Sequence, residues 1–245
     1  DNPSSVLSSL AQARENARTV RDIMPREAWE LINELHHYAR EHASSGVSKR
    51  GRYKYLQTVI RAIQSLSGLL LGTMNHGDGY SFLTVGRALE RADMTTRILD
   101  VRSSSLVPDD ATAGLAPFES AQWRSVLKSL TAYQMYRQKM HARIGRHNVL
   151  VFLLQDDEFP RAVSRCLDLL ESGLSRLPHN DAPRRSLAVV QRMISRADIH
   201  TLAVDKAALH EFLDQVQERL AVVHDDITST WFLAGMSAES VEATM

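Results

Sequence analysis

The stretch that decides the fold is Phe82-Leu-Thr-Val-Gly-Arg-Ala-Leu-Glu-Arg-Ala-Asp-Met-Thr-Thr-Arg-Ile-Leu-Asp100. On a helix of 3.6 residues per turn, one apolar stripe is formed by Phe82, Val85, Leu89, Ala92, Thr96 and Leu99. A second apolar stripe is formed by Leu83, Met94, Ile98 and Val101. This spacing predicts a long helix that faces the core of a helical protein.

Polar residues lie between the two stripes. Glu90, Asp93 and Arg97 fall in this inner sector, and Arg91 falls in the sector that we expect to face solvent. Asp93 and Arg97 are four residues apart and can pair within the helix. A buried carboxylate without a partner is costly. We therefore expect Glu90 to be buried against a cation from a second helix, which Gly86 would allow to approach closely.

This buried, paired arrangement has a measurable consequence. The Glu90→Ala substitution would cost roughly 3–5 kcal/mol of stability, because it would leave buried arginine charges without a partner. We favour a structural ion-pair network for these residues over a reactive carboxylate, because structural networks also shift pKa values.

The expected cation donors lie in a helix that begins at Asn2-Pro3 and runs to about residue 23. Arg14, Arg18 and Arg21 border the apolar stripe of this helix. They either form ion pairs with Glu90 and Asp93 or extend along the surface into solvent.

A second group of cations, Lys49, Arg50, Arg52 and Lys54, precedes a long apolar helix. Positive charge at a helix start opposes the helix dipole. The group is either a patch that binds an anion or a partner, or a solvated charged turn.

Composition narrows the class of protein. The 245 residues contain 29 Lys+Arg and 29 Asp+Glu, so the formal net charge is zero. A protein that binds nucleic acids or anionic membranes in general should be basic, so we expect neither as a partner of this chain. No run of apolar residues reaches the length of a membrane span. Cys166 is the one cysteine, so no disulfide forms within the chain and a reducing cytoplasm is expected.

The chain as a whole predicts an all-α fold, an antiparallel bundle of about eight or nine helices in one or two sub-bundles. We expect an N-terminal half over residues 1–105, a linker over 106–117, a C-terminal half over 118–234 and a tail over 235–245. Helices are expected from about 120 to 144, 184 to 204 and 206 to 232.

Metal and catalytic signals are weak. Glu34-x-x-His37 is half of a di-iron signature whose second half is missing from the sequence. His224, Asp225 and Asp226 are consecutive, and consecutive residues on a helix do not face one ion. Cys166 fits a small buried apolar residue better than a nucleophile. We therefore expect no metal, no cofactor and no catalytic residue.

Several motifs resemble one bacterial family. They are the Ala13–Arg18 segment, Trp29 with Asn33, the Leu89-Glu-Arg-Ala-Asp93 segment, Phe152-Leu-Leu154 and Phe159-Pro-Arg161. Together they are similar to the alpha-E family, an all-helical domain named for a Glu-Arg motif that falls here on Glu90 and Arg91. Members usually begin with an additional helix that bears a first Glu-Arg-Ala-like motif. We expect that helix to be lost, or this sequence to be part of a longer or fused protein.

The resemblance also implies a function. Proteins of this family resemble partners of circularly permuted ATP-grasp ligases, which form amide bonds. We therefore expect a non-catalytic helical module that docks such a ligase or holds its small peptide. The alternative is an enzyme that acts on a peptide or aminoacyl group through Glu90 and arginines, and this alternative requires Glu90 to line an open pocket. A third possibility is a self-associating structural protein.

Overall fold

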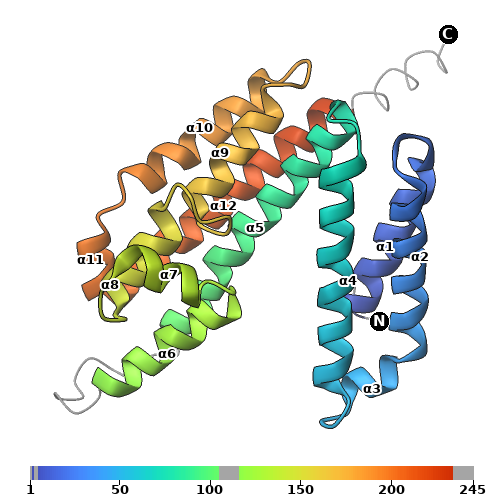
Figure 1. Cartoon of the computed structure of the whole chain (residues 1–245). Coiled ribbons are helices and arrows are strands. Elements are labelled where there is room, and N and C mark those ends of the chain that lie inside the picture. Colours follow the sequence, from blue (N-terminus) through green and yellow to red (C-terminus); the bar gives the residue numbers. More distant parts are fainter. Residues whose placement is uncertain (1, 3–4, 105–115, 234–245) are drawn as a thin grey trace. The chain divides into compact units, whose positions relative to one another are not determined.

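The computed structural model describes residues 2, 5–104 and 116–233 of the chain. Every regular element within these residues is helical, which confirms the predicted all-α class. The chain divides into two compact units, Asp1–Tyr80 and Ser81–Met245. Figure 1 shows the helices of both units.

The first unit is built on three long helices with two short elements between them. Its elements are α1 (Val6–Thr19), the 3₁₀ turn η1 (Arg21–Ile23), α2 (Arg26–Glu41), α3 (Ala43–Val47) and α4 (Arg52–Thr73). The side chain of Ser5 accepts a hydrogen bond from the Ser8 N–H and caps α1. Helix α2 packs against both α1 and α4, and its Leu35 and Ala39 form a core with Tyr55 and Val59.

The second unit contains the larger core. Its elements are α5 (Asp78–Ser104, which begins in the first unit), α6 (Ala116–Ser129), α7 (Tyr133–Met140), α8 (Arg146–Leu150), the π-helix η2 (Val151–Gln155), α9 (Val163–Leu174), α10 (Asp181–Ser195), α11 (Ile199–Val204) and α12 (Lys206–Trp231). Helices α9, α10 and α12 pack together around a continuous apolar core. In Figure 1 they run beside α5, with α6–α8 gathered at one end.

Helices α5 and α12 are antiparallel. The Phe82 ring meets the Trp231 ring with centroids 5.4 Å apart, and Asp100 bonds to His210 at the other end of the pair. Residue numbers therefore rise along α5 as they fall along α12. This register decides which side chains share the groove between the two helices.

The buried side of α5 overlaps the predicted stripe, since Val85, Ala92, Thr96 and Leu99 are all buried, but it is shifted toward Ala88 and Thr95. Val85, Ala88, Ala92 and Leu99 are buried in the core, and Thr95 is buried on the side that was expected to face solvent. Leu89, predicted to be central, is only half-buried. The small residues Ala88 and Ala92 carry the packing, because they let neighbouring helices approach closely.

The glycine that allows another helix to pack closely on α5 is Gly173, not Gly86. Gly86 is exposed, with no atom near the position of a Cβ, so its predicted role is wrong. At Gly173 of α9, a Cβ would lie 2.7 Å from the Val85 Cγ2 atom. Gly173 therefore allows α9 to pack tightly on α5.

Two predicted helices are interrupted. The helix expected from 120 to 144 breaks between α6 and α7, where Thr131 has a φ of 55°. The helix expected from 184 to 204 breaks between α10 and α11, where the Asp198 side chain accepts bonds from the His200 and Thr201 N–H groups. Such breaks, together with the short helices α3 and α8, make the described elements more numerous than the predicted eight or nine.

The division of the chain also differs from the predicted one. The two units divide between residues 80 and 81, in the first turn of α5, rather than in the expected 106–117 linker. The reason is that Val85, Ala88, Ala92 and Leu99 belong to the same core as α9, α10 and α12. Residues 105–115 of that linker and the tail from 235 to 245 lie outside the described residues.

The length and hydropathy of the helices bear on whether any of them could cross a membrane. Within the described residues, each helix is too short or too polar to cross a lipid bilayer.

Candidate functional site

The Glu-Arg helix lines a pocket in the groove between α5 and α12, which we call the Glu90 pocket. Its polar lining residues are Glu90, Asp93 and Arg97 of α5 together with Gln217 and His224 of α12, and its apolar lining residues are Leu89, Leu220 and Ala221. The volume is about 210 Å³. The cavity is open and small enough to suit a single aminoacyl unit, since pockets for drug-sized ligands are about 300–1,000 Å³.

The position of Glu90 corrects the central expectation from the sequence. Glu90 is exposed, and within the described residues its carboxylate forms no hydrogen bond and no ion pair. The prediction that Glu90 is buried against a cation from a second helix is therefore wrong. The physical reason is the shift of the buried side of α5, which brings Ala88 and Thr95 into the core and leaves Glu90 facing the groove.

The predicted pair between Asp93 and Arg97 is confirmed. The Arg97 Nε atom lies 2.6 Å from the Asp93 Oδ2 atom. This hydrogen bond raises the pKa of Arg97, and Glu90 contributes a weaker electrostatic effect in the same direction. The pair leaves the other N–H groups of the Arg97 guanidinium open to the pocket, because the Arg97 side chain is 54% exposed.

Helix α12 supplies the opposite wall. The Gln217 Nε2 atom is buried and has no hydrogen-bond partner within the described residues. A buried amide without a partner costs free energy that a ligand oxygen would recover. The pocket therefore combines an unpaired carboxylate, which suits an amine, with unpaired N–H donors, which suit a carbonyl or carboxylate.

Arg91 follows Glu90 on α5 and points about 100° around the helix axis from it. One turn after Arg91, the Thr95 hydroxyl donates a hydrogen bond of 2.9 Å to the Arg161 carbonyl. Desolvation, followed by the positive charge of Arg91, lowers the pKa of the Arg161 guanidinium. The two residues of the Glu-Arg motif therefore face different neighbours, and Arg91 is half-buried rather than solvent-facing.

The arginines of α1 have partners in their own unit. The Arg14 Nε atom donates to the Asn33 Oδ1 atom at 2.7 Å, and Arg18 pairs with Glu15. The guanidinium groups of Arg14 and Arg21 lie 5.6 and 5.4 Å from the centroid of the Trp29 ring. These contacts join α1 to α2 by cation–π attraction. The alternative in which these arginines pair with Glu90 and Asp93 stays a prediction.

The predicted basic segment lies around the start of α4. Lys49, Arg50, Arg52 and Lys54 are all exposed, and the Arg52 guanidinium donates to the Val47 carbonyl at 3.0 Å. Their use as an anion or partner patch stays a prediction.

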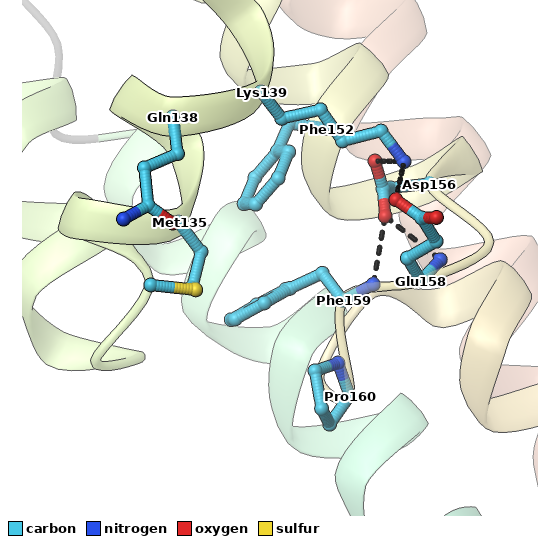
Figure 2. A pocket seen from close by; sticks show the side chains of 8 residues that line it. All are labelled: Met135, Gln138, Lys139, Phe152, Asp156, Glu158, Phe159 and Pro160. Atoms are coloured by element: carbon cyan, nitrogen blue, oxygen red, sulfur yellow. Dashed lines mark hydrogen bonds and ion pairs between the residues drawn. The ribbon is translucent and has the colours of Figure 1, made fainter.

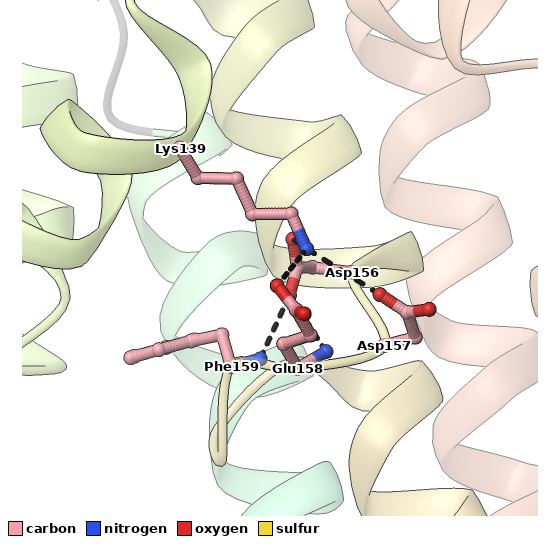
Figure 3. A network of polar contacts seen from close by, with 5 residues as sticks. All are labelled: Lys139, Asp156, Asp157, Glu158 and Phe159. Carbon is pink, nitrogen blue, oxygen red and sulfur yellow. Dashed lines mark hydrogen bonds and ion pairs between the residues drawn. The ribbon is translucent and has the colours of Figure 1, made fainter.

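A second cluster of charges, which the sequence did not indicate, surrounds Lys139 of α7. Its Nζ atom lies 2.8 Å from both Asp156 Oδ2 and Glu158 Oε2, and 3.4 Å from Asp157 Oδ1. Asp156 also accepts the N–H groups of Glu158 and Phe159 at 2.9 and 2.7 Å. Figure 3 shows these contacts converging on the turn after η2. We call this group the Lys139 cluster.

The charges of the Lys139 cluster satisfy one another. Burial raises the pKa of Asp156, but the bonds from Lys139 and from the Phe159 and Glu158 N–H groups outweigh burial and leave that pKa below its ordinary value. Bonds to Asp156 and then Glu158 raise the pKa of Lys139. Asp156 is the only one of the three acids that is buried, so it holds the turn in place.

An apolar cavity of about 400 Å³ opens beside the Lys139 cluster. Figure 2 shows Met135 and the Phe152 and Phe159 rings around it, with Lys139, Asp156 and Glu158 at one side. The two rings stack with centroids 4.9 Å apart. Phe152 is supplied by η2, and π-helical turns are frequent at functional sites. The cavity suits an apolar group, but its charged residues are already paired.

A third cluster joins α5 to the start of α12. The His210 Nδ1 atom lies 2.6 Å from Asp100 Oδ1, and its Nε2 atom lies 3.5 Å from Asp214 Oδ2. The ligand atoms of these three residues lie within 4.8 Å of one another, which is compatible with a metal site. The two carboxylates face opposite ring nitrogens, however, and this arrangement suits an imidazolium. The bond to Asp100 raises the pKa of His210.

Cys166 and the Glu34-x-x-His37 sequence differ in their exposure to solvent. Cys166 is fully buried, and burial raises the pKa of its thiol to about 11, so the thiol is neutral and unreactive at pH 7. Glu34 and His37 are both exposed on α2.

Comparison with known proteins places the chain in a family. The Alpha-E family model, described as a predicted alpha-helical domain with a conserved ER motif, matches residues 1–232. An uncharacterized protein of Mycobacterium bovis and one of Mycobacterium tuberculosis are each 24% identical over 243 residues. Each match covers 94% of this chain and 27% of the relative, so the chain spans about a quarter of the length of these proteins. No solved structure gives a significant match.

Proposed function

Because the chain belongs to the Alpha-E family, we propose that it is a non-catalytic helical module that holds a peptide or aminoacyl substrate for an ATP-grasp-type amide ligase. The observation that carries this proposal is the unpaired Glu90 carboxylate at the mouth of an open pocket. The family resemblance supplies the ligase partner and the amide chemistry, and the pocket supplies the binding groups. A reducing cytoplasm is the proposed compartment.

The pocket matches the two ends of an aminoacyl group. The Glu90 carboxylate accepts hydrogen bonds from a protonated amine and neutralises its charge. The open N–H groups of Arg97 and the orphan amide of Gln217 donate to a carbonyl or carboxylate oxygen. Leu89 and Leu220 give an apolar wall for a side chain. Binding at both ends fixes the orientation of a small ligand better than either contact alone.

The binding step is tested with dipeptides and isotope-labelled protein. Titration with alanyl-alanine should shift the amide resonances of residues 86–97 and 214–224, and N-acetyl-alanyl-alanine should bind more weakly because its amine is blocked. Glu90→Gln should lose the preference for the free amine and keep the fold. Equal binding of the two dipeptides, or no shifts with either, would contradict the proposed site.

The ligase partnership is tested separately. The module and the ATP-grasp ligase encoded with it are co-expressed and separated by size, and amide formation by the ligase is measured with and without the module. The proposal expects co-elution and a higher rate of amide formation with the module. A ligase that is monodisperse and fully active alone would count against it.

A second candidate function is an enzyme acting on the same ligand. Its specific support is that Glu90 and His224, two side chains able to exchange protons, line one pocket. Hydrolysis or transfer of an aminoacyl group by the isolated chain, abolished in both Glu90→Gln and His224→Gln, would favour this function over substrate holding. Self-association remains a third proposal, and the solution mass of the isolated chain tests it.

A further inference from the structure

A different cavity of the second unit is positively charged. Arg124 of α6, Arg137 of α7 and Arg143 of the connection between α7 and α8 line it, together with Ser120, Tyr133 and Ile144. Its volume is about 430 Å³. We call it the arginine pocket. It shares no lining residue with the Glu90 pocket or with the cavity beside the Lys139 cluster.

Among the residues that the structure describes, the three guanidinium groups of the arginine pocket have no acidic partner. Arg124, Arg137 and Arg143 are exposed, and within the described residues none of their side chains forms a hydrogen bond or an ion pair. Glu119, which precedes Ser120 on α6, contacts Arg146 at 3.3 Å and the Trp123 ring nitrogen at 3.4 Å and does not line the cavity. Three like charges around one cavity repel one another, and a bound anion would relieve that repulsion.

The scaffold of the arginine pocket is fixed by hydrogen bonds away from the arginines. The Ser120 hydroxyl donates to the Ile144 carbonyl at 3.0 Å, which ties α6 to the loop that carries Arg143. The buried Tyr136 hydroxyl donates to the Arg143 carbonyl at 3.2 Å. These bonds set the backbone positions of the pocket and leave the guanidinium groups open to a ligand.

From this arrangement we propose that the arginine pocket binds a small organic phosphate that carries two or more negative charges. The planar guanidinium fork matches two oxygens of one phosphate, and three such forks match a diphosphate better than a single carboxylate. The cavity is larger than a phosphate group alone needs. The half-buried Tyr133 ring adds a flat wall on which a ring of the ligand can stack. This site goes beyond the substrate holding proposed for the Glu90 pocket.

Isothermal titration calorimetry at low ionic strength tests the arginine pocket with named probes. Inorganic pyrophosphate and ADP should each bind, and added salt should weaken both. Arg124→Gln, Arg137→Gln and Arg143→Gln should each weaken binding by about tenfold, because each removes one charge-assisted contact. Arg185→Gln, which removes an exposed arginine of α10 that lines none of these cavities, is the matched control and should change affinity less than about twofold.

Two further arms distinguish the ligand class from general charge attraction. Tyr133→Leu should weaken ADP and leave pyrophosphate unchanged, because only ADP has a ring to stack. Citrate, a tricarboxylate, should bind more weakly than pyrophosphate. The proposal is overturned by no binding of pyrophosphate and ADP at millimolar concentration, by equal binding of citrate, or by an equal loss in Arg185→Gln. Because the three arginines are exposed, the melting temperatures of their variants should match that of the parent protein. If one variant does not fold, the other two still test the proposal.

Discussion

The Glu90 pocket and the Lys139 cluster both place carboxylates beside a cavity of the second unit, but the central carboxylate is paired in only one of them. Asp156 of the Lys139 cluster is 5% exposed and accepts three hydrogen bonds. Glu90 is exposed and has no such bond within the described residues. A carboxylate whose hydrogen bonds are all satisfied by the protein stabilises the fold. A carboxylate left open at a pocket is available to a ligand.

The largest expected effect comes from the paired side of this comparison. Asp156→Ala should lower the free energy of unfolding by about 2–3 kcal/mol, because it leaves two backbone N–H groups without their acceptor and removes the one buried carboxylate that bonds to Lys139. Urea denaturation measures the loss. The matched control is Asp157→Ala in the same turn, whose side chain is 79% exposed and which should cost less than about 0.5 kcal/mol. Equal losses would erase the distinction between the two acids.

Acid should reveal the same contact. The pKa of Asp156 is below its ordinary value in the folded state, so its contribution to stability is present above the unfolded pKa of about 3.9 and is lost as pH falls through the folded pKa. Below about pH 4 the parent protein should therefore lose stability more steeply than Asp156→Asn. Unfolding curves recorded between pH 2 and 6 measure the two slopes, and parallel slopes would count against a charged, bonded Asp156.

A smaller loss of stability is expected when a buried hydrogen bond of α5 is removed. Thr95→Val should cost about 1 kcal/mol, because the buried Thr95 hydroxyl donates to the Arg161 carbonyl on the side of Arg91. Thr73→Val is the control, since the Thr73 hydroxyl is exposed and bonds only within its own helix, to the Leu69 carbonyl. Chemical denaturation should show a change within about 0.5 kcal/mol for the control. Equal changes in the free energy of unfolding would show that the Thr95 hydrogen bond stabilises the fold no more than an exposed bond within one helix.

The contact between His210 and Asp100 should make the stability of the protein depend on pH. Its pKa is raised by Asp100, so the stability from this contact is complete below the unfolded pKa of about 6.5 and is lost as pH rises through the folded pKa. His210→Gln should therefore remove a decline in stability that the parent shows above about pH 6.5. Melting temperatures between pH 5.5 and 8.5 measure this decline. A parent protein with a flat profile would show that the ion pair contributes nothing.

The sequence predicted the helical class, the Glu-Arg helix and most of its buried stripe, but not the exposure of Glu90. Apolar periodicity correctly placed Val85, Ala92 and Leu99 in the core, but it did not place Ala88 there. Small residues near the edge of a stripe can pack inward when a partner such as Gly173 offers no side chain. A single sequence does not reveal that partner, so the prediction buried Glu90.

The pairing of charges was predictable only when it was local. Asp93 and Arg97 are one turn apart, and their ion pair followed from helical spacing. Lys139 and Asp156 lie 17 positions apart and meet because α7 packs beside the turn after η2. The run Asp156-Asp157-Glu158 before Phe159-Pro160 does signal a turn in which an aspartate accepts backbone N–H groups. The arginine pocket likewise joins residues from three segments that no local pattern connects.

The most direct test of the account is the free energy of unfolding of Glu90→Ala, measured by urea denaturation at pH 7. Because Glu90 is exposed and unpaired within the described residues, the account predicts a value within about 0.5 kcal/mol of the parent. A loss of about 3–5 kcal/mol would contradict it, since a loss of that size belongs to a buried carboxylate that holds a partner charge.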